Sequence, residues 1–314
     1  MYMRVTAQTL ASNVIANMEQ QSSALATITN QVSSGIRIQS PSDDPAGWVA
    51  LTQAQTASNQ LGAYSQTISD ATSTLNAGTS ALQNVSNILS QATQIATQGA
   101  NVNTATSPDG YSALATQVNG LITQLVSAAN STSGGTYLFG GTATTAPPFQ
   151  VTATDAQGDP NSVSYVGSTA PGRELIGAGQ TVDTRYVGSQ VFQASGADAF
   201  QALITLRNNL TNPTLTQSEA SMSTALNQSL SDISAASTSV DNATAEQASS
   251  VSTLTATQSR VQALQLAANT EVGNVGGTDY TSAIVQMQSD QTALQASEDV
   301  SAKLLQTNLL SFIQ

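Results

Sequence analysis

Apolar residues near the N-terminus recur at the spacing of a coiled-coil seam. The intervals between them are four, seven, three and four residues, which match the a and d positions of a heptad. An isolated helix with such a stripe is marginal in water, because nothing covers its apolar side. The pattern therefore predicts a helix before Pro41 that needs a partner helix. The members of this seam are Val14, Met18, Leu25, Ile28 and Val32, and Gln21 fills the one remaining position.

The partner helix is predicted at the other end of the chain. The segment GNVGG (273–277) is predicted to break the preceding helix, and after it the chain continues to its last residue without glycine or proline. Because apolar residues again follow at intervals of four, three and seven, we expect a second seam that pairs with the first. The members of this second seam are Tyr280, Ile284, Met287 and Leu294.

The last seven residues, NLLSFIQ, are apolar on too many sides for a single partner helix. Burying one Leu or Phe is worth about 1.5–3 kcal/mol, so this end is expected to contact other subunits. Contact with a membrane is the alternative, which the absence of a basic face disfavours. The predicted assembly interface comprises Val14, Met18, Leu25, Ile28, Val32, Ile284, Met287, Leu294, Leu305, Leu309 and Phe312.

Further helices are predicted between the prolines, since proline destabilises a helix interior by about 3 kcal/mol. An unbroken heptad runs from Leu61 to Ala96. A shorter one runs from Tyr111 to Ala128, in a helix predicted to end at the glycine pair 134–135. Helix resumes near Asp198 and stops before Pro213. A last one runs from Ser218 to Val272 and contains polar residues at inward positions. Such residues lower stability and specify the register of the pair. They are Ser237, Thr244, Gln247, Gln258 and Gln265.

The stretch 134–196 has a different composition. It holds 11 of the 21 glycines and four of the eight prolines. Short runs of β-type residues lie between these turn signals, and they predict a small β-rich insert. The runs are TYLF, FQVTAT, SVSYVG, RELI and TVDTRYV.

The predicted fold class is mainly α with a β-rich insert. A terminal coiled-coil domain would comprise residues 1–45 and 275–314, and a long α-helical rod domain 46–135 and 198–274. An outer β-rich domain would comprise 136–197, so that the three parts are nested with the two ends of the chain as the innermost pair. The alternative is a partly disordered low-complexity protein, which unbroken heptads in separate segments disfavour.

Composition excludes much of the chemistry of enzymes. The chain has no histidine and no cysteine, which removes His-dependent triads, zinc motifs and disulfides. Its net charge is −12, with seven basic residues and no basic cluster, so neither nucleic acid nor an anionic membrane is an expected partner. No catalytic residue, cofactor or metal is expected. Neither a cleavable signal peptide nor a membrane-spanning stretch is expected.

Asp43 and Asp44 are adjacent carboxylates, but neighbouring side chains diverge and do not face each other across a substrate. Beside Pro45 they are interpreted as acceptors in a turn and at a helix N-terminus. Arg37 is one of few cations near them, and an ion pair with them is plausible within one chain or between subunits.

Several motifs resemble those of the flagellin superfamily. The segment SSGIRIQSPSDDPAGW (33–48) is similar to the N-terminal signature of that superfamily, and its proline form is more like that of the hook–filament junction members. The segment TYLFGGTATTAPPF (136–149) resembles the family's entry into its outer domain. The exit from that domain is similar to GSQVF (188–192) followed by FQAL (200–203). The C-terminal segment from ALQAS (293–297) onward is also similar to that of the family. The hinge motif comprises Gly35, Arg37, Pro41, Asp43, Asp44 and Pro45.

The resemblance implies a structural protein of the bacterial flagellum with no catalysis. Such a protein is exported unfolded by the flagellar type III route, with a cytosolic chaperone on its C-terminal helix. It assembles with itself as a ring that joins the first hook-associated protein to flagellin, outside the cell. Two alternatives remain: a flagellin that forms the filament itself, and a secreted adhesin or enzyme that acts through the β insert.

Overall fold

The computed structural model describes the backbone of residues 7–101, 108–212, 215 and 218–313. The chain divides into two compact units. The first comprises Met1–Gln60 and Leu264–Gln314, and the second comprises Leu61–Ala263. The observed class is mainly α with a β-rich insert, as predicted. The division into three domains proposed from the sequence stays a prediction.

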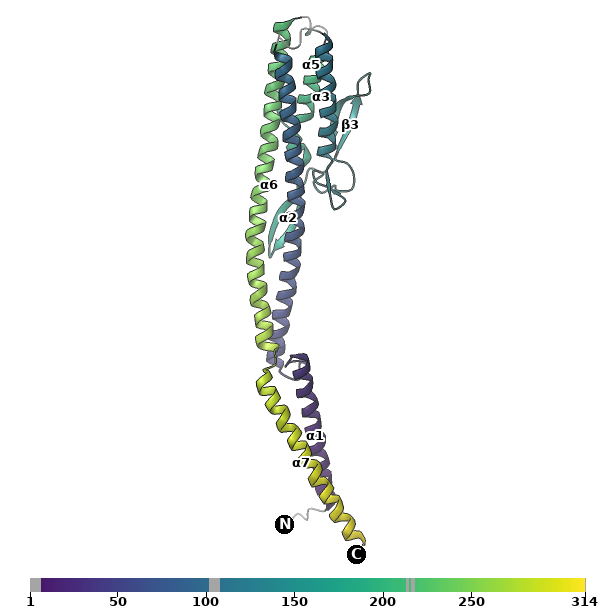
Figure 1. Cartoon of the computed structure of the whole chain (residues 1–314), viewed down its shortest axis with the longest axis vertical. Helices are drawn as coiled ribbons and strands as arrows, with labels where there is room; N and C mark the ends of the chain where they lie inside the picture. The colour runs from purple at the N-terminus through teal and green to yellow at the C-terminus, as the bar shows by residue number, and fades with distance from the viewer. Residues whose placement is uncertain (1–6, 102–107, 213–214, 216–217, 314) are drawn as a thin grey trace. The chain divides into compact units, whose positions relative to one another are not determined.

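The first unit pairs the two ends of the chain, as predicted. Helix α1 (Ala7–Ser34) lies beside helix α7 (Tyr280–Ile313) (Figure 1). Polar contacts cross between them: Ser297 Oγ donates to Gln21 Oε1 at 2.8 Å, and Ser301 Oγ lies 3.1 Å from Met18 Sδ. The polar position at Gln21 therefore has a polar counterpart on α7.

The predicted seam on α7 is wrong at its first two positions. Ile284 and Tyr280 are 40% and 52% exposed, whereas Ala283 is only 5% exposed. Met287 and Leu294 fit two heptad frames, one that continues to 284 and 280 and one that continues to 283 and 290. The structure adopts the second frame. The inward positions of α7 are Ala283, Met287, Asp290, Leu294, Ser297 and Ser301.

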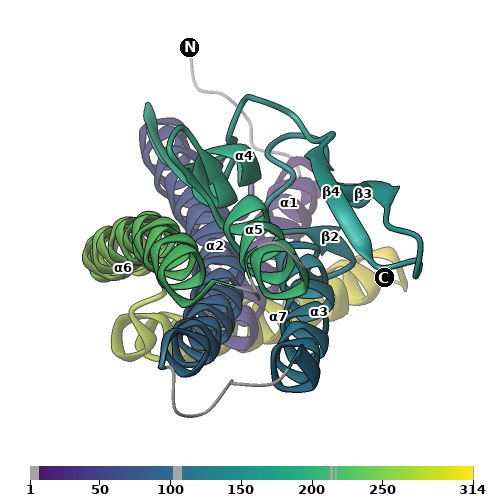
Figure 2. The ribbon, with the colours of Figure 1, turned by 90° about the horizontal axis from the view of Figure 1, so that it is seen from above.

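The second unit contains most of helices α2 (Pro45–Ala100) and α6 (Glu219–Gly276), together with α3 (Pro108–Ala129) and α5 (Ala199–Thr211). The predicted heptad of α2 is buried from Ile68 to Ala96. Ala81, Ile88 and Ile95 form a further buried row on α2. Helices α3 and α5 lie beside α2 and α6 at one end of the unit, where the four helices form a bundle around a common core (Figures 1 and 2).

Polar residues lie in the α2–α6 contact of the second unit, as the sequence predicted. Gln247 is buried, and its Oε1 accepts a hydrogen bond from Thr79 Oγ1 at 3.3 Å. A Cβ on Gly78 would lie 2.9 Å from the same Oε1, so glycine makes room for the amide. Gln258 Nε2 donates to Ser65 Oγ at 2.8 Å. These contacts fix which residues of the two helices face each other.

The β-rich insert consists of two-stranded antiparallel sheets. Strands β1 (Thr132–Ser133) and β2 (Thr136–Tyr137) form the first, and β7 (Gln193–Ala194) and β8 (Ala197–Asp198) the last. The longer hairpins are β3 (Phe149–Thr154) with β4 (Pro160–Tyr165), and β5 (Gly172–Gly177) with β6 (Gln180–Arg185). Each predicted run therefore contains a strand, although the last two residues of TYLF, SVSYVG and TVDTRYV lie beyond their strands.

Four phenylalanines join the insert to the helices. The Phe192 ring lies 5.0 Å from that of Phe139 and 5.4 Å from that of Phe149, both edge to face. Phe149 is also 5.1 Å from Phe200 at the start of α5. Phe192 ends the short helix α4 (Gly188–Phe192). Edge-to-face packing of buried rings contributes beyond the area that they bury, so this cluster is a main anchor of the insert.

Two helix ends differ from prediction. The segment 273–277 was expected to break the chain, but α6 continues through Gly273 to Gly276, and the break lies at 277–279. Helix α3 ends at Ala129, before the glycine pair 134–135. No helix in the described part is long and apolar enough to cross a membrane.

Candidate assembly site

The hinge of the first unit is the place where two connections pair. One connection joins α1 to α2 and the other joins α6 to α7. Arg37 N donates to the Gly276 carbonyl at 2.7 Å, and Thr278 N donates to the Gly35 carbonyl at 3.0 Å. These two bonds surround a β-bridge between Ile36 and Gly277. The hinge, defined as residues 35–48 and 272–279, is thus held by backbone bonds between segments far apart in sequence.

Gly35 ends α1 in the left-handed region, with φ +71°. Its N–H donates to the Gln31 carbonyl at 2.9 Å, which closes the last turn. A Cβ at this position would lie 2.7 Å from the Tyr280 hydroxyl oxygen. Both the backbone angle and the close approach therefore require glycine here.

Arg37 links both connections through its side chain as well. Nη2 donates to the Val275 carbonyl at 2.8 Å, and Nη1 lies 3.4 Å from Asp44 Oδ2. The Arg37 side chain is 45% exposed, so its ion pair with Asp44 is screened by solvent. The hydrogen bond to Val275 ties the end of α6 to the segment before α2.

Asp43 and Asp44 take the structural roles that the sequence predicted. Asp43 Oδ2 accepts from the N–H groups of Gln39 and Ser40 at 2.9 and 2.8 Å, and these bonds lower the pKa of its carboxyl. Asp44 Oδ1 accepts from Gly47 N at 2.9 Å, which caps α2 and lowers the pKa of Asp44.

Two prolines complete this segment. Pro45 is the first residue of α2, where its missing N–H needs no partner. Pro41 follows Ser40 in a turn closed by the bond from Asp43 N to the Ser40 carbonyl at 3.1 Å. The structure thus brings the six residues of the hinge motif into one segment, and their role in assembly stays a prediction.

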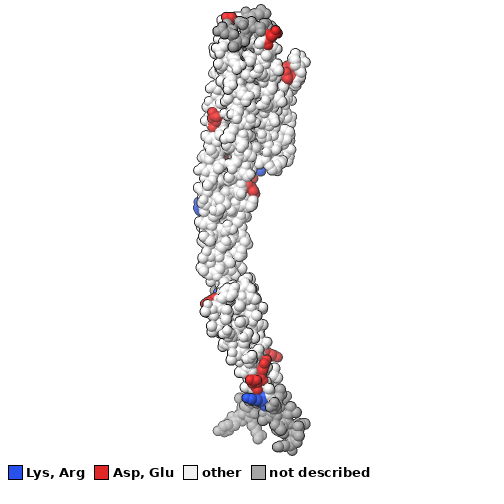
Figure 3. Space-filling view, in the orientation of Figure 1, with Lys and Arg blue, Asp and Glu red and all other residues white. Residues whose placement is uncertain are grey.

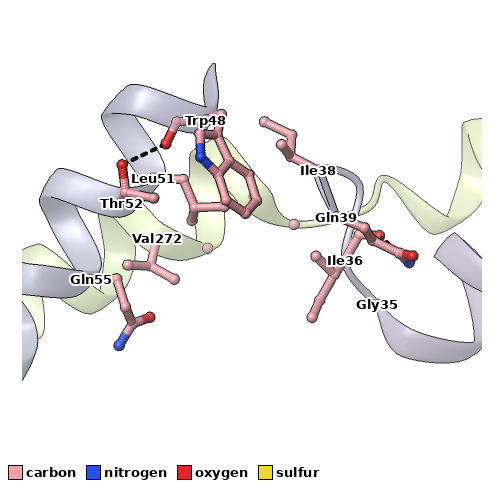
Figure 4. A pocket seen from close by; sticks show the side chains of 12 residues that line it. Gly35, Ile36, Ile38, Gln39, Trp48, Leu51, Thr52, Gln55 and Val272 are labelled. Atoms are coloured by element: carbon pink, nitrogen blue, oxygen red, sulfur yellow. Dashed lines mark hydrogen bonds between the residues drawn. The ribbon is translucent and has the colours of Figure 1, made fainter. Parts of the chain in front are cut away.

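A cavity of about 520 Å³ opens beside the hinge. In Figure 4 the Trp48 ring lies between Leu51 and the segment that carries Ile36 and Ile38. A Cβ on Gly276 would lie 2.8 Å from Leu51 Cδ1, so this glycine lets α6 approach α2 closely.

Sequence reasoning missed this cavity. Gly273, Gly276 and Gly277 stand three and four residues apart and line it together. Residues at that spacing lie on one face of a helix, and this pattern in the sequence could have indicated the cavity. Trp48 is half-buried and lines the cavity.

Among its described residues, the first unit has almost no buried core of its own. Of the buried apolar residues in the described part of the chain, only Ile38 and Ala283 belong to it. The N-terminal seam from Val14 to Val32 is half-buried throughout, as are Met287 and Leu294. Leu305, Leu309 and Phe312 lie outside the residues whose side chains are described. The large apolar side chains that this unit exposes are Ile15, Ile36, Val49, Leu264, Leu266, Tyr280, Ile284, Val285 and Val300.

Charge is sparse on the surface. Most of the face in Figure 3 carries neither acidic nor basic side chains. Among the described residues, no group of three or more carboxylates is placed to hold a metal ion. The arrangement presents uncharged and apolar surface, which is suited to contact with other protein chains.

Comparison with known proteins bears on this arrangement. Residues 5–144, which include the hinge motif, match the bacterial flagellin N-terminal helical region. The predicted resemblance to the flagellin superfamily is confirmed. This chain is also 25% identical over 201 residues to flagellar hook-associated protein 3 of Salmonella typhimurium. That alignment covers 63% of this chain and 59% of the relative, so it spans less than two thirds of the relative's length.

Solved structures share the fold. A hook-associated protein of Vibrio parahaemolyticus superimposes with a TM-score of 0.64 at 19% identity, covering 75% of this chain and 100% of that one. The flagellar junction protein FlgL of Legionella pneumophila gives a TM-score of 0.53 at 15% identity, covering 63% and 96%. At these identities the likeness shows the fold. The Salmonella relative is, by its name, a hook-associated protein of the flagellum.

Proposed function

We propose that this chain is a structural subunit of the bacterial flagellum and that its copies form the ring between hook and filament. One face of the ring would bind the first hook-associated protein and the other would bind flagellin. The single observation that carries the proposal is that the described side chains of the first unit include many large apolar ones that are exposed and very few that are buried. Similarity to hook-associated protein 3 supports this position in the flagellum over others.

The proposed role is mechanical. It requires no catalysis, cofactor or metal, but it requires that copies of the chain complete each other's apolar surfaces. The α1–α7 pair has inward positions occupied by Gln21, Asp290 and Ser297, and these bury little apolar area. A pair of this kind gains most of its stability when a neighbour covers its outer side, since anything that binds only the folded state stabilises it.

The same weakness supports export in an unfolded state. A helical pair with polar residues along its contact has little free energy to lose on unfolding. We infer that the chain leaves the cell through the flagellar type III apparatus with its N-terminal signal uncleaved. A cytosolic chaperone would cover the apolar C-terminal residues until then.

Location on intact flagella tests the proposal directly. A labelled antibody against the chain is expected to mark a band at the outer end of the hook and nowhere else. Label along the whole filament would instead favour the flagellin alternative, because a filament contains thousands of copies and a ring only a few. Label on cell surfaces without flagella would favour the adhesin.

Truncation tests the role of the C-terminal helix. Removal of residues 305–314 is expected to leave a soluble protein whose second unit melts normally but which no longer joins hook to filament. In the intact monomer, backbone amides of α1 before residue 35 and of α7 after residue 279 are expected to exchange fast, while those of the second unit are protected. Filaments of normal length in the truncated strain, or uniform protection in the monomer, would overturn the proposal.

A further inference from the structure

Arg207 is the one buried cation among the described side chains. It lies on α5 in the second unit, far in sequence from the hinge, and its side chain is 3% exposed. The assembly proposed above makes no use of it. A buried guanidinium is costly unless its N–H groups are paired, so its partners indicate what it does.

The partners of the guanidinium come from the β3–β4 hairpin and from α3. Nη1 donates to the Pro160 carbonyl at 2.8 Å and to Asn119 Oδ1 at 3.2 Å, and it lies 3.3 Å from Asp155 Oδ2. Nη2 donates to Asn161 Oδ1 at 2.9 Å. Nε and Nη2 also donate to Asn208 Oδ1 on α5 itself, at 3.1 and 2.9 Å. Every N–H-bearing nitrogen of the guanidinium is thus paired with oxygen.

The tip of the hairpin is built to present these oxygens. Asp155 Oδ1 accepts from Gln157 N at 3.0 Å and from Asp159 N at 2.9 Å, which leaves Oδ2 to face Arg207. Asp159 Oδ2 in turn accepts from Asn119 Nδ2 at 2.6 Å, so that Asn119 Oδ1 is turned toward the guanidinium. Oxygen-bearing residues at 155, 157, 159 and 161 give the alternating pattern of turns that wrap a cation. Here the cation is a side chain of the same chain.

The hairpin has little else to hold its tip. Strand β4 packs against α5, and β3 lies on the outer side, where every residue after Phe149 is exposed (Figure 2). At the base, the Asn130 side chain bonds the Phe149 backbone with both its donor and its acceptor, each at 2.9 Å. The base is therefore fixed by Asn130, and the tip by Arg207.

We propose that these oxygens form a guanidinium-binding site, which Arg207 occupies from within the chain, and that this occupancy docks the β3–β4 tip onto α3 and α5. A planar cation with several N–H groups in a fixed fork fits acceptors that lie around one plane, whereas an ammonium of the same charge makes fewer bonds there. Arg207 is thus a positioning residue for the outer hairpin.

The test replaces Arg207 with Ala and then adds a small guanidinium compound that can occupy the emptied site. Arg207→Ala is expected to lower the Tm of the second unit by roughly 6 °C or more. It is also expected to speed amide exchange in β3 and β4 by about tenfold or more, with β5 and β6 much less affected. N-ethylguanidinium at about 20 mM is expected to reverse both changes in the variant and to leave the wild type unchanged, while ethylammonium at the same concentration does not.

Arg173→Ala is the matched control. Arg173 is also in an ion pair, with Asp183 at 2.7 Å, but its side chain is 63% exposed, so neither Tm nor hairpin exchange is expected to change much. Equal acceleration in all hairpins, no acceleration in β3 and β4, or rescue by ethylammonium or Ca²⁺ in place of N-ethylguanidinium would overturn the proposal. If Arg207→Ala fails to fold, Arg207→Lys is measured in the same way, and an undisturbed hairpin in that variant would equally refute guanidinium selectivity.

Discussion

The hinge depends on Arg37, and we predict that Arg37→Ala loosens the first unit without unfolding the second. The substitution removes the hydrogen bond from Nη2 to the Val275 carbonyl at 2.8 Å and the contact with Asp44 at 3.4 Å. The backbone bond from Arg37 N to Gly276 remains possible in the variant. The side-chain contribution is thereby isolated from the β-bridge of the hinge.

The expected magnitude follows from the two contacts. The exposed ion pair contributes about 0–1 kcal/mol. A hydrogen bond from a charged donor contributes about 1.5–3 kcal/mol, and the lower end applies because the side chain is nearly half exposed. Since Asp44 keeps its bond from Gly47 N, we expect a loss of about 1–2 kcal/mol in the local stability of the hinge. That corresponds to roughly 5–30-fold more opening.

Two probes report on this opening. Thr278 N–H, bonded to the Gly35 carbonyl at 3.0 Å, is expected to exchange 5–30 times faster, about the factor just derived. Trp48 is the only tryptophan and lines the hinge cavity, so its fluorescence is expected to become more accessible to acrylamide. Arg37→Lys, which keeps the charge, is the conservative control, and Arg173→Ala is the control outside the hinge. If Thr278 exchange changes less than about twofold in Arg37→Ala, the assigned role of Arg37 is wrong.

Three further predictions concern the rest of the chain. Gln247→Leu is expected to raise the Tm of the second unit by about 2–4 °C, because Thr79 Oγ1 keeps its bond to the Leu75 carbonyl and loss of the amide oxygen leaves no group unpaired. A lower Tm in the variant contradicts this. Phe192→Ala is expected to lower the free energy of unfolding by about 3–5 kcal/mol in urea titrations, because it removes a fully buried ring from the phenylalanine cluster. A loss below about 1 kcal/mol contradicts the anchoring role of this cluster. The pKa values of Asp43 and Asp44 are lowered, so their bonds stabilise the hinge above the unfolded pKa of about 3.9 and are lost as pH falls through the lower folded values. Trp48 fluorescence is therefore expected to stay constant down to about pH 4. A change already at pH 5–6 contradicts this assignment.

Much of the second unit was predictable from the sequence. The heptad of α2 identified the buried residues from Ile68 to Ala96, because side chains three and four residues apart share one face of a helix whatever covers them. Asp198 was placed at the start of a helix, and its carboxylate accepts from Gln201 N at 2.9 Å. Local rules of periodicity and capping suffice for such features.

Features that depend on contacts between distant residues were not predictable in the same way. The α7 seam was assigned to the wrong frame because Met287 and Leu294 satisfy two heptads, and only the position of α1 decides between them. Gly273 was interpreted as a helix breaker, whereas α6 continues past it. Glycine weakens a helix by about 1 kcal/mol, which close packing offsets, as at Gly276 against Leu51.

Arg207 shows the same limit more strongly. Its acceptors on α3 and in the β3–β4 hairpin lie 46–88 residues away in sequence, and no spacing rule connects them. The alternation of oxygen-bearing residues from 155 to 161 was present in the sequence, but it indicates a cation only if the turn lies near one.

The contrast between the two units gives the assembly proposal its physical basis. In the second unit, large side chains such as Leu75, Leu89 and Phe192 are almost completely covered within a single chain. In the first unit, Val285 and Val300 remain 64% and 50% exposed, while polar Asp290 and Ser297 occupy inward positions. Covering the exposed part of each valine would add about 1 kcal/mol. In the proposed assembly a neighbouring chain would supply this cover, so folding of the first unit would be coupled to its place in the assembly.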